Sequence, residues 1–208
     1  MAPARATVQD GPATPPGTYF VDVATGSNPA GSSVTVGAGT PITVTIHNCS
    51  ANDAVCGTDS ALYLGSAQFT ISNAGLDDTN SSLSAAVSNG NKKWSASISG
   101  DTVTLTAAAG DELAPGESVS VQVTPTKVVS GQTVDTSASS SDANSSNDFV
   151  PASGARAPTL TVVPGPLAQF AIAAIVGQTA GSSFAVSATA EDAYGNTVTG
   201  YGGGATVG

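Results

Sequence analysis

The chain has 208 residues, a length that fits one large domain or two small ones, and only 10% of them are charged, against about 25% in typical soluble domains. Its formal net charge is −10 with 5 Lys and Arg residues, so it lacks the basic clusters that bind nucleic-acid phosphates or an anionic lipid surface. Small and β-branched residues (Ala, Gly, Ser, Thr and Val) fill most positions, and this composition favours β-sheet.

Residues 1–17 are rich in Pro, Gly, Ala and Thr and are predicted to form a flexible leader. They contain no apolar segment of the kind that marks a signal peptide, so we expect an export signal to have been removed or to lie outside this sequence. No run approaches the ~20 apolar residues of a membrane-spanning helix, and no membrane span is expected.

Short runs with a period of two occupy the sequence from residue 18 to residue 163. In one of them Ile42, Val44 and Ile46 alternate with threonines, and the same alternation recurs at 103–105 and 119–123. This pattern is typical of half-buried strands, and the turn signals between the runs predict a β-sandwich over 18–163. The predicted strands lie within residues 18–24, 32–39, 41–48, 66–73, 81–88, 93–99, 101–109, 117–129, 132–140 and 158–164.

The two cysteines, Cys49 and Cys56, lie in a segment rich in Asn, Asp and Gly. A disulfide that closes a small loop between two strands is the first interpretation, and it fits an oxidising compartment. Two reduced thiols or a metal pair are the alternatives. Zinc normally takes four Cys or His ligands, and only His47 could join the cysteines.

Two glycine-containing segments, 89–91 and 99–101, are predicted to be hairpin tips, because Gly and Asn tolerate positive φ. Trp94, the single tryptophan, follows the first of them. It is predicted to fill the core between two sheets, with a sugar-stacking surface as the alternative.

Calcium is the ion for which the sequence offers the best ligands, because oxygen-bearing side chains gather in two segments. The first candidate site consists of Asp142, Asn144, Asn147 and Asp148, and the second of Asp77, Asp78 and Asn80. Neither follows the EF-hand spacing, and Asx side chains also cap turns without a metal, which is the competing interpretation.

No catalytic site is expected. A hydrolytic triad needs a histidine, and His47, the single one, has no accompanying Gly-x-Ser-x-Gly segment, so it is interpreted as a loop histidine. The acid pairs at 77–78, 111–112 and 191–192 are adjacent, would face opposite sides of a strand, and are interpreted as solvated turns. Chance explains the three Asn-x-Ser sequons, which begin at Asn48, Asn80 and Asn144.

A Pro-Gly-Pro segment, 164–166, is predicted to be a stiff linker into an incomplete second module, 164–208. Its apolar faces include Phe170 and Ile172 in one predicted strand and Phe184 and Val186 in the next. Half a sandwich cannot cover them, so we expect the missing strands to follow Gly208 or to come from another chain by strand pairing. Alone, the chain is expected to self-associate or to leave 165–208 mobile.

The segment 131–154, with its turn at 142–148, resembles the end of bacterial conserved-repeat (DUF11-type) immunoglobulin-like domains. Ala143 and Asp148 stand where that family usually has Pro and Asn, and the first half is longer. The segment 165–201, with its EDAYGNTVTGY signature, resembles the opening half of an immunoglobulin-like repeat of large bacterial surface proteins. Together the resemblances imply an all-β fold: an immunoglobulin-like β-sandwich plus an incomplete second immunoglobulin-like module.

Neither family has catalytic residues, so the resemblances imply a non-catalytic structural or adhesive module, a stalk or filament building block of a secreted or cell-surface protein. The expected partners are neighbouring repeats, other copies, or a cell-surface or glycan ligand. One alternative is a ligand- or carbohydrate-binding accessory domain of a larger secreted enzyme, with residues 52–59 of the cysteine loop as the contact surface.

Overall fold

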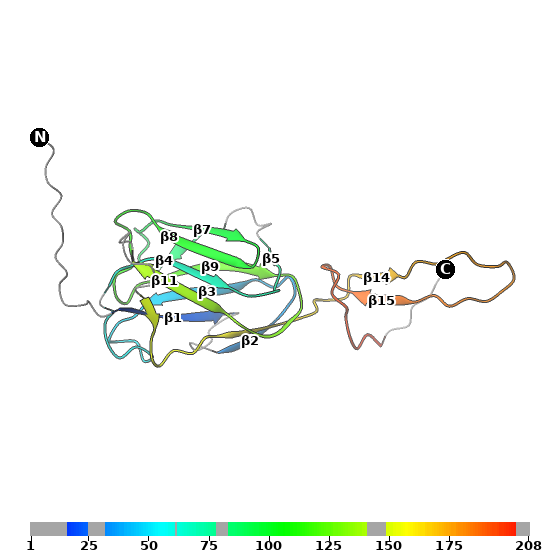
Figure 1. Cartoon of the computed structure of the whole chain (residues 1–208), viewed down its shortest axis with the longest axis horizontal. Helices are drawn as coiled ribbons and strands as arrows, with labels where there is room; N and C mark the ends of the chain where they lie inside the picture. Colours follow the sequence, from blue (N-terminus) through cyan, green and yellow to red (C-terminus); the bar gives the residue numbers. More distant parts are fainter. Residues whose placement is uncertain (1–15, 25–31, 61, 78–82, 141–148, 203–208) are drawn as a thin grey trace, which may run out of the picture.

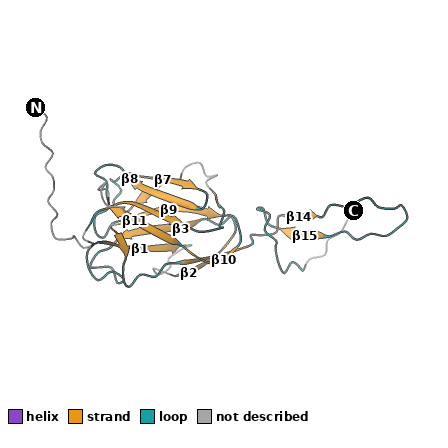
Figure 2. Ribbon diagram, viewed as in Figure 1, coloured by secondary structure: helices purple, strands orange, loops and turns teal. Residues whose placement is uncertain are grey.

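The computed structural model describes residues 16–24, 32–60, 62–77, 83–140 and 149–202. All regular structure in these residues is β-strand, which confirms the predicted all-β class (Figure 2). Within the same residues there is no helix long and apolar enough to cross a membrane.

Most strands between residues 16 and 163 overlap the predicted alternating runs. The strands at 76–77 and 149–151 were not predicted, and the one at 129–133 spans the gap between the runs predicted at 117–129 and 132–140. The bounds of the strands are β1 Gly17–Ala24, β2 Ser33–Gly37, β3 Ile42–Asn48, β4 Leu64–Thr70, β5 Leu76–Asp77, β6 Ala86–Val87, β7 Trp94–Ser99, β8 Thr102–Ala107, β9 Ser118–Pro125, β10 Val129–Thr133, β11 Asp135–Ser140, β12 Phe149–Pro151 and β13 Thr159–Val163. Two further strands, β14 Gln169–Ile172 and β15 Ala188–Glu191, lie beyond them.

Strands β1 to β13 form three sheets that enclose one core, and we call residues 17–163 the sandwich (Figure 1). The largest sheet has the order β12-β1-β3-β9-β5, with β6 also paired to β9. The others have the orders β11-β4-β8-β7 and β10-β13-β2. Two pairs are parallel, β1 with β12 and β2 with β13, so the first strands of the sandwich are paired with its last.

The core includes the predicted inward-facing residues. Ile42, Val44 and Ile46 of β3 are fully buried, and Val103 and Leu105 of β8 are as well. Thr43 and Thr45 point to the opposite side of β3 and are only partly buried. Trp94 also belongs to the core, as predicted, and its indole Nε1 donates a hydrogen bond to the carbonyl of Asp111 at 2.9 Å.

One of the two predicted hairpins is formed by paired strands, whereas the other is reduced to a single antiparallel bridge between Ser84 and Ser95. Ser99–Asp101 does connect the antiparallel strands β7 and β8, with Gly100 at φ 58°. The Asn89–Asn91 segment, in contrast, joins β6, which pairs with β9, to β7, which pairs with β8 in another sheet. The turn residues marked a change of direction correctly, but the chain crosses between sheets there.

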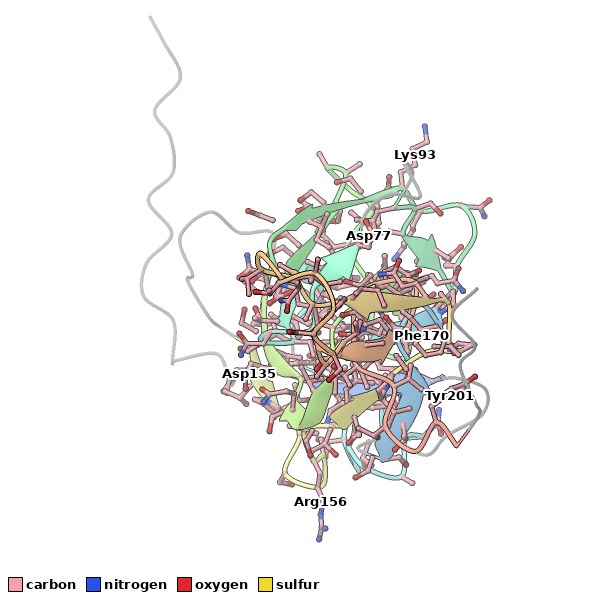
Figure 3. The ribbon with its side chains drawn as sticks, turned by 90° about the vertical axis from the view of Figure 1, so that its right-hand side faces the viewer. Asp77, Lys93, Asp135, Arg156, Phe170 and Tyr201 are labelled. Atoms are coloured by element: carbon pink, nitrogen blue, oxygen red, sulfur yellow. A yellow bond between two sulfur atoms is a disulfide. The ribbon has the colours of Figure 1, made fainter. Side chains whose placement is uncertain are left out.

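Strands β14 and β15 form a separate two-stranded ribbon that projects from one end of the sandwich (Figure 1). We call residues 167–202 the C-terminal ribbon. Paired residues share a face, so Phe170 and Ile172 lie on the same face as Ala190 and Ala188. The aromatic ring of Tyr201 packs edge-on against that of Phe170, with 5.4 Å between ring centroids (Figure 3).

Large apolar residues of the ribbon are exposed, as the sequence predicted. Ile172, Phe184 and Val186 expose 56%, 50% and 51% of their surface. Residues 182–187, which include Phe184 and Val186 of the second predicted strand, do not form a strand. Extended backbone becomes a strand only where a neighbour accepts its hydrogen bonds, and the pairing of β15 with β14 starts at Ala188.

We expect Phe69→Ala in β4 to lower the free energy of unfolding of the sandwich by about 3–5 kcal/mol, because the ring is fully buried. Gln68→Ala, one residue earlier on the exposed face, is the matched control and should change it by less than about 0.5 kcal/mol. Urea unfolding followed by the fluorescence of Trp94 measures both. Equal effects of the two substitutions would contradict the assignment of the faces.

Candidate functional site

The sandwich and the C-terminal ribbon meet at the loop that follows β15, residues 192–196, which we call the Asp192 loop. Asp192 exposes only 1% of its surface, although it follows directly after the partly exposed Glu191. The loop turns back at once, because the amide of Gly195 donates to the carbonyl of Asp192 and Gly195 adopts φ 80°. This geometry places the Asp192 side chain against the linker.

The carboxylate of Asp192 accepts hydrogen bonds from four N–H groups. The backbone amides of Tyr194 and Asn196 donate to Oδ1 at 2.8 and 2.9 Å. The backbone amide of Gly165 donates to Oδ2 at 2.8 Å, and Nδ2 of Asn196 donates to the same oxygen at 2.9 Å. Burial by itself would raise the pKa of Asp192, but these hydrogen bonds outweigh it and hold the pKa below its usual value.

Asn196 carries the contact across to the sandwich. Its Nδ2 also donates to the carbonyl of Thr126 at 2.8 Å, and its Oδ1 accepts from the amide of Val128 at 3.3 Å. Thr126 and Val128 lie in the turn between β9 and β10. The side-chain amide therefore bonds at once to its own loop and to two backbone groups of the sandwich.

The Asp192 loop can approach the sandwich and the linker closely because two positions there are glycines without a side chain. A Cβ added to Gly39 would lie 2.4 Å from the ring of Tyr194, and one added to Gly165 would lie 2.9 Å from the carbonyl oxygen of Ala38. Gly39 also has φ 83°, in the left-handed region that favours glycine. The sandwich thus receives the Asp192 loop through backbone groups and glycine surfaces.

The interpretation of Glu191 and Asp192 as a solvated acid pair was wrong for Asp192. Asp192 can be buried because backbone N–H groups of its own loop donate hydrogen bonds to the carboxylate. Two adjacent acidic residues in a sequence do not indicate such donors. The signal was nevertheless present in the sequence. An Asp at the end of a predicted strand, with Gly and Asn three and four residues later, is typical of a turn in which the Asp side chain accepts from the backbone.

The predicted disulfide is present. Cys49 and Cys56 are bonded, with 5.7 Å between their Cα atoms, and residues 49–60 form what we call the disulfide loop. Cys49 is fully buried in a small apolar cluster with Phe20 and Ala152. Inside the loop, the Asp53 carboxylate accepts from the amide and hydroxyl of Ser50 at 2.8 and 3.0 Å. The exposed residues of the loop are Ala51, Asn52, Ala54 and 57–59.

His47 lies on β3, not in a loop as interpreted from the sequence. Its Nε2 lies 3.2 Å from an Asp22 carboxylate oxygen, and its ring stacks on Phe20 with 4.2 Å between centroids. Asn48, the first sequon asparagine, is fully buried, and its Nδ2 donates to the carbonyls of Leu62 and Leu113. That side chain is therefore not accessible to glycosylation.

The first predicted calcium site, Asp142, Asn144, Asn147 and Asp148, lies outside the described residues, and so do Asp78 and Asn80 of the second. The described part of the chain contains no group of three or more His, Cys, Asp or Glu side chains placed to hold a metal ion. A shallow depression of 210 Å³ on the β11-β4-β8-β7 sheet is lined by Ser, Thr, Gln and Ala residues, none of which titrates near neutral pH.

No protein-family model matches this chain, so neither family resemblance is supported at that level, and no curated protein matches it. A solved structure titled "Non-cellulosomal cohesin from the hyperthermophilic archaeon Archaeoglobus fulgidus" is similar over 70% of this chain and 91% of its own. The two chains are 14% identical, with a TM-score of 0.41.

We call the contact of the Asp192 loop with the linker and the sandwich the joint. We expect Asp192→Asn to weaken the joint by about 1.5–3 kcal/mol, because a side-chain amide cannot accept hydrogen bonds from all four N–H groups. In the unsubstituted chain, the pKa of Asp192 is lower in the folded state than in the unfolded state. The stabilisation by Asp192 is therefore present above an ordinary Asp pKa of about 3.9 and is lost as the pH falls through the folded pKa. Amide hydrogen exchange at Gly165, Tyr194 and Asn196, measured from pH 3 to 7, checks both effects.

Glu191→Gln is the control, since it removes the adjacent charge and leaves the Asp192 hydrogen bonds in place. Its exchange rates should match those of the unsubstituted chain. Equal protection in the Asp192→Asn variant would show that the carboxylate does not hold the joint.

Proposed function

We propose that the chain is a non-catalytic structural module of a bacterial extracellular protein, in which an immunoglobulin-like sandwich at 18–163 is rigidly coupled to a second β-unit at 164–208. The observation that carries the proposal is the Asp192 loop, which bonds to the linker and to the sandwich at once. Such a joint gives a stalk a fixed direction from one unit to the next.

The joint restrains the ribbon at separate points, which is what a fixed orientation requires. Gly165 of the linker, the β9–β10 turn at Thr126 and Val128, and the surface of Gly39 each contact the Asp192 loop. Contacts at separate points oppose motion of the ribbon more than a single contact would. The partners on the sandwich belong to turns that are themselves hydrogen-bonded, since the amide of Gly39 donates to the carbonyl of Pro125 and that of Lys127 to the carbonyl of Ala74.

The remaining features support an extracellular location. The Cys49–Cys56 disulfide is the kind of bond that persists in oxidising compartments. The acidic, lysine-poor composition suits a solvated surface outside the cell.

A second candidate function, ligand binding at the opposite end of the sandwich, is favoured by one observation. Tyr63 exposes 60% of its surface shortly after the disulfide loop, whose tip is exposed as well. An exposed aromatic ring that follows a loop closed by a disulfide provides a surface on which a sugar could stack. In this interpretation the chain is a carbohydrate-binding accessory domain.

We expect Gly39→Ala to uncouple the ribbon from the sandwich, because the new methyl group would displace the Tyr194 ring. In ¹⁵N relaxation measurements, residues 167–202 of the unsubstituted chain should tumble with the sandwich. In the variant they should tumble faster. Independent tumbling in the unsubstituted chain would overturn the proposal.

The control for this experiment is Gly110→Ala. Gly110 has φ 86°, close to that of Gly39, but an added Cβ would have no atom within 4 Å. Both variants should lose about 1–2 kcal/mol of sandwich stability from backbone strain, measured by Trp94 fluorescence. Only Gly39→Ala should free the ribbon.

The ligand-binding alternative predicts that a soluble oligosaccharide from a defined panel binds the chain and that Tyr63→Ala weakens its binding about tenfold. Isothermal titration calorimetry measures this, with Tyr201→Ala on the ribbon as the control. The absence of binding across the panel would count against the carbohydrate-binding function and leave the structural one unaffected.

A further inference from the structure

The ribbon repeats the turn by which the sandwich receives the Asp192 loop. In the sandwich, the amide of Thr40 donates to the carbonyl of Gly37 at 3.0 Å and closes a four-residue turn before β3. In the ribbon, the amide of Ser182 donates to the carbonyl of Thr179 at 3.2 Å and closes a turn before β15. The third residues, Gly39 and Gly181, have nearly the same φ, 83° and 85°.

The sequences that contain the two turns follow the same pattern. Residues 38–45 read Ala-Gly-Thr-Pro-Ile-Thr-Val-Thr, and residues 180–187 read Ala-Gly-Ser-Ser-Phe-Ala-Val-Ser. Both have Ala-Gly, then a hydroxyl residue, and then a large apolar residue (Ile42 or Phe184) that is followed two positions later by Val. Positive φ alone requires the glycine, but it does not require the rest of this pattern.

The two turns also occupy corresponding places. The Gly39 turn precedes β3 at the end of the sandwich that holds the Asp192 loop. The Gly181 turn comes before β15 in the chain, and the Asp192 loop comes directly after β15. The turn and the loop therefore lie at opposite ends of one extended segment. In Figure 1 the chain between β14 and β15 accordingly forms the end of the ribbon farthest from the sandwich.

The turns differ in what covers them. The surface of Gly39 is covered by the Tyr194 ring, whereas a Cβ added to Gly181 would meet nothing within 4 Å. The chain around Gly181 is also uncharged, since residues 167–190 contain no Asp, Glu, Lys or Arg. An aromatic ring is the kind of group that such a surface accepts.

We propose that the Gly181 turn is an acceptor for the tyrosine of an Asp-x-Tyr-Gly-Asn loop from another unit of this kind, so that units associate head to tail. The proposal rests on the proposed function and extends it from one joint to a series. The turn supplies the part of the acceptor that Gly39 supplies in the sandwich. The part that corresponds to Thr126 and Val128 has no counterpart in the described ribbon, so the isolated contact is weak.

The test uses a second copy of the chain as the donor. Unlabelled Gly39→Ala chain, whose Asp192 loop is released from its own sandwich, is titrated into ¹⁵N-labelled unsubstituted chain up to millimolar concentration. We expect amide shifts concentrated at residues 179–183. The Gly39→Ala/Tyr194→Ala double variant as donor should give shifts at least fivefold smaller.

Labelled Gly181→Ala should also respond at least fivefold less, while labelled Gly200→Ala should respond fully, because Gly200 has φ 83° and open space around it. If ¹⁵N relaxation shows the donor's ribbon released but no shift appears at 179–183, the acceptor is refuted and the proposed function stands. Shifts that persist without the donor's Tyr194 would refute it equally. A donor whose ribbon is not released would instead contradict the joint itself.

Discussion

A carboxylate that is almost fully removed from water must be matched by hydrogen-bond donors, and Asp192 takes its donors from two places at once. The amides of Tyr194 and Asn196 come from its own loop, and the amide of Gly165 comes from the linker. The loop and the linker are thereby held in one arrangement. The bonds of Asn196 to the sandwich, and the contact of Tyr194 with Gly39, depend on that arrangement.

The long alternating strands of the sandwich could be predicted from the sequence because alternation is a local property, whereas the short strands β5 and β12 could not. The alternation in a run such as Ile42 to Ile46 predicts which side of that strand faces the core, and this prediction does not depend on which strands pair with it. Pairing is not local, and neither the parallel pairs β1–β12 and β2–β13 nor the crossing at Asn89–Asn91 could be inferred. Turn residues show where a chain reverses, but the sheet it then joins is decided by packing far away in the sequence.

The candidate site was predicted only in part, for a similar reason. The disulfide follows from two cysteines in a turn-rich segment, and the stiffness of the linker follows from Pro164 and Pro166. The burial of Asp192 depends on a linker amide 27 residues earlier in the chain. The motif around Asp192 was visible as a resemblance, yet its physical role appears only when Gly39 and Thr126 are brought beside it.

The arrangement of the first and last strands has a mechanical consequence. Strand β1 begins at the end of the sandwich where the disulfide loop lies, since the amide of Cys49 donates to the carbonyl of Thr18. Strand β13 ends at the opposite end, where Gly165 meets Asp192. Tension along the chain therefore pulls both strands along their length, and the hydrogen bonds to their neighbours bear the load in shear, all together. An unzipping geometry, in which bonds fail one after another, would yield at a much smaller force.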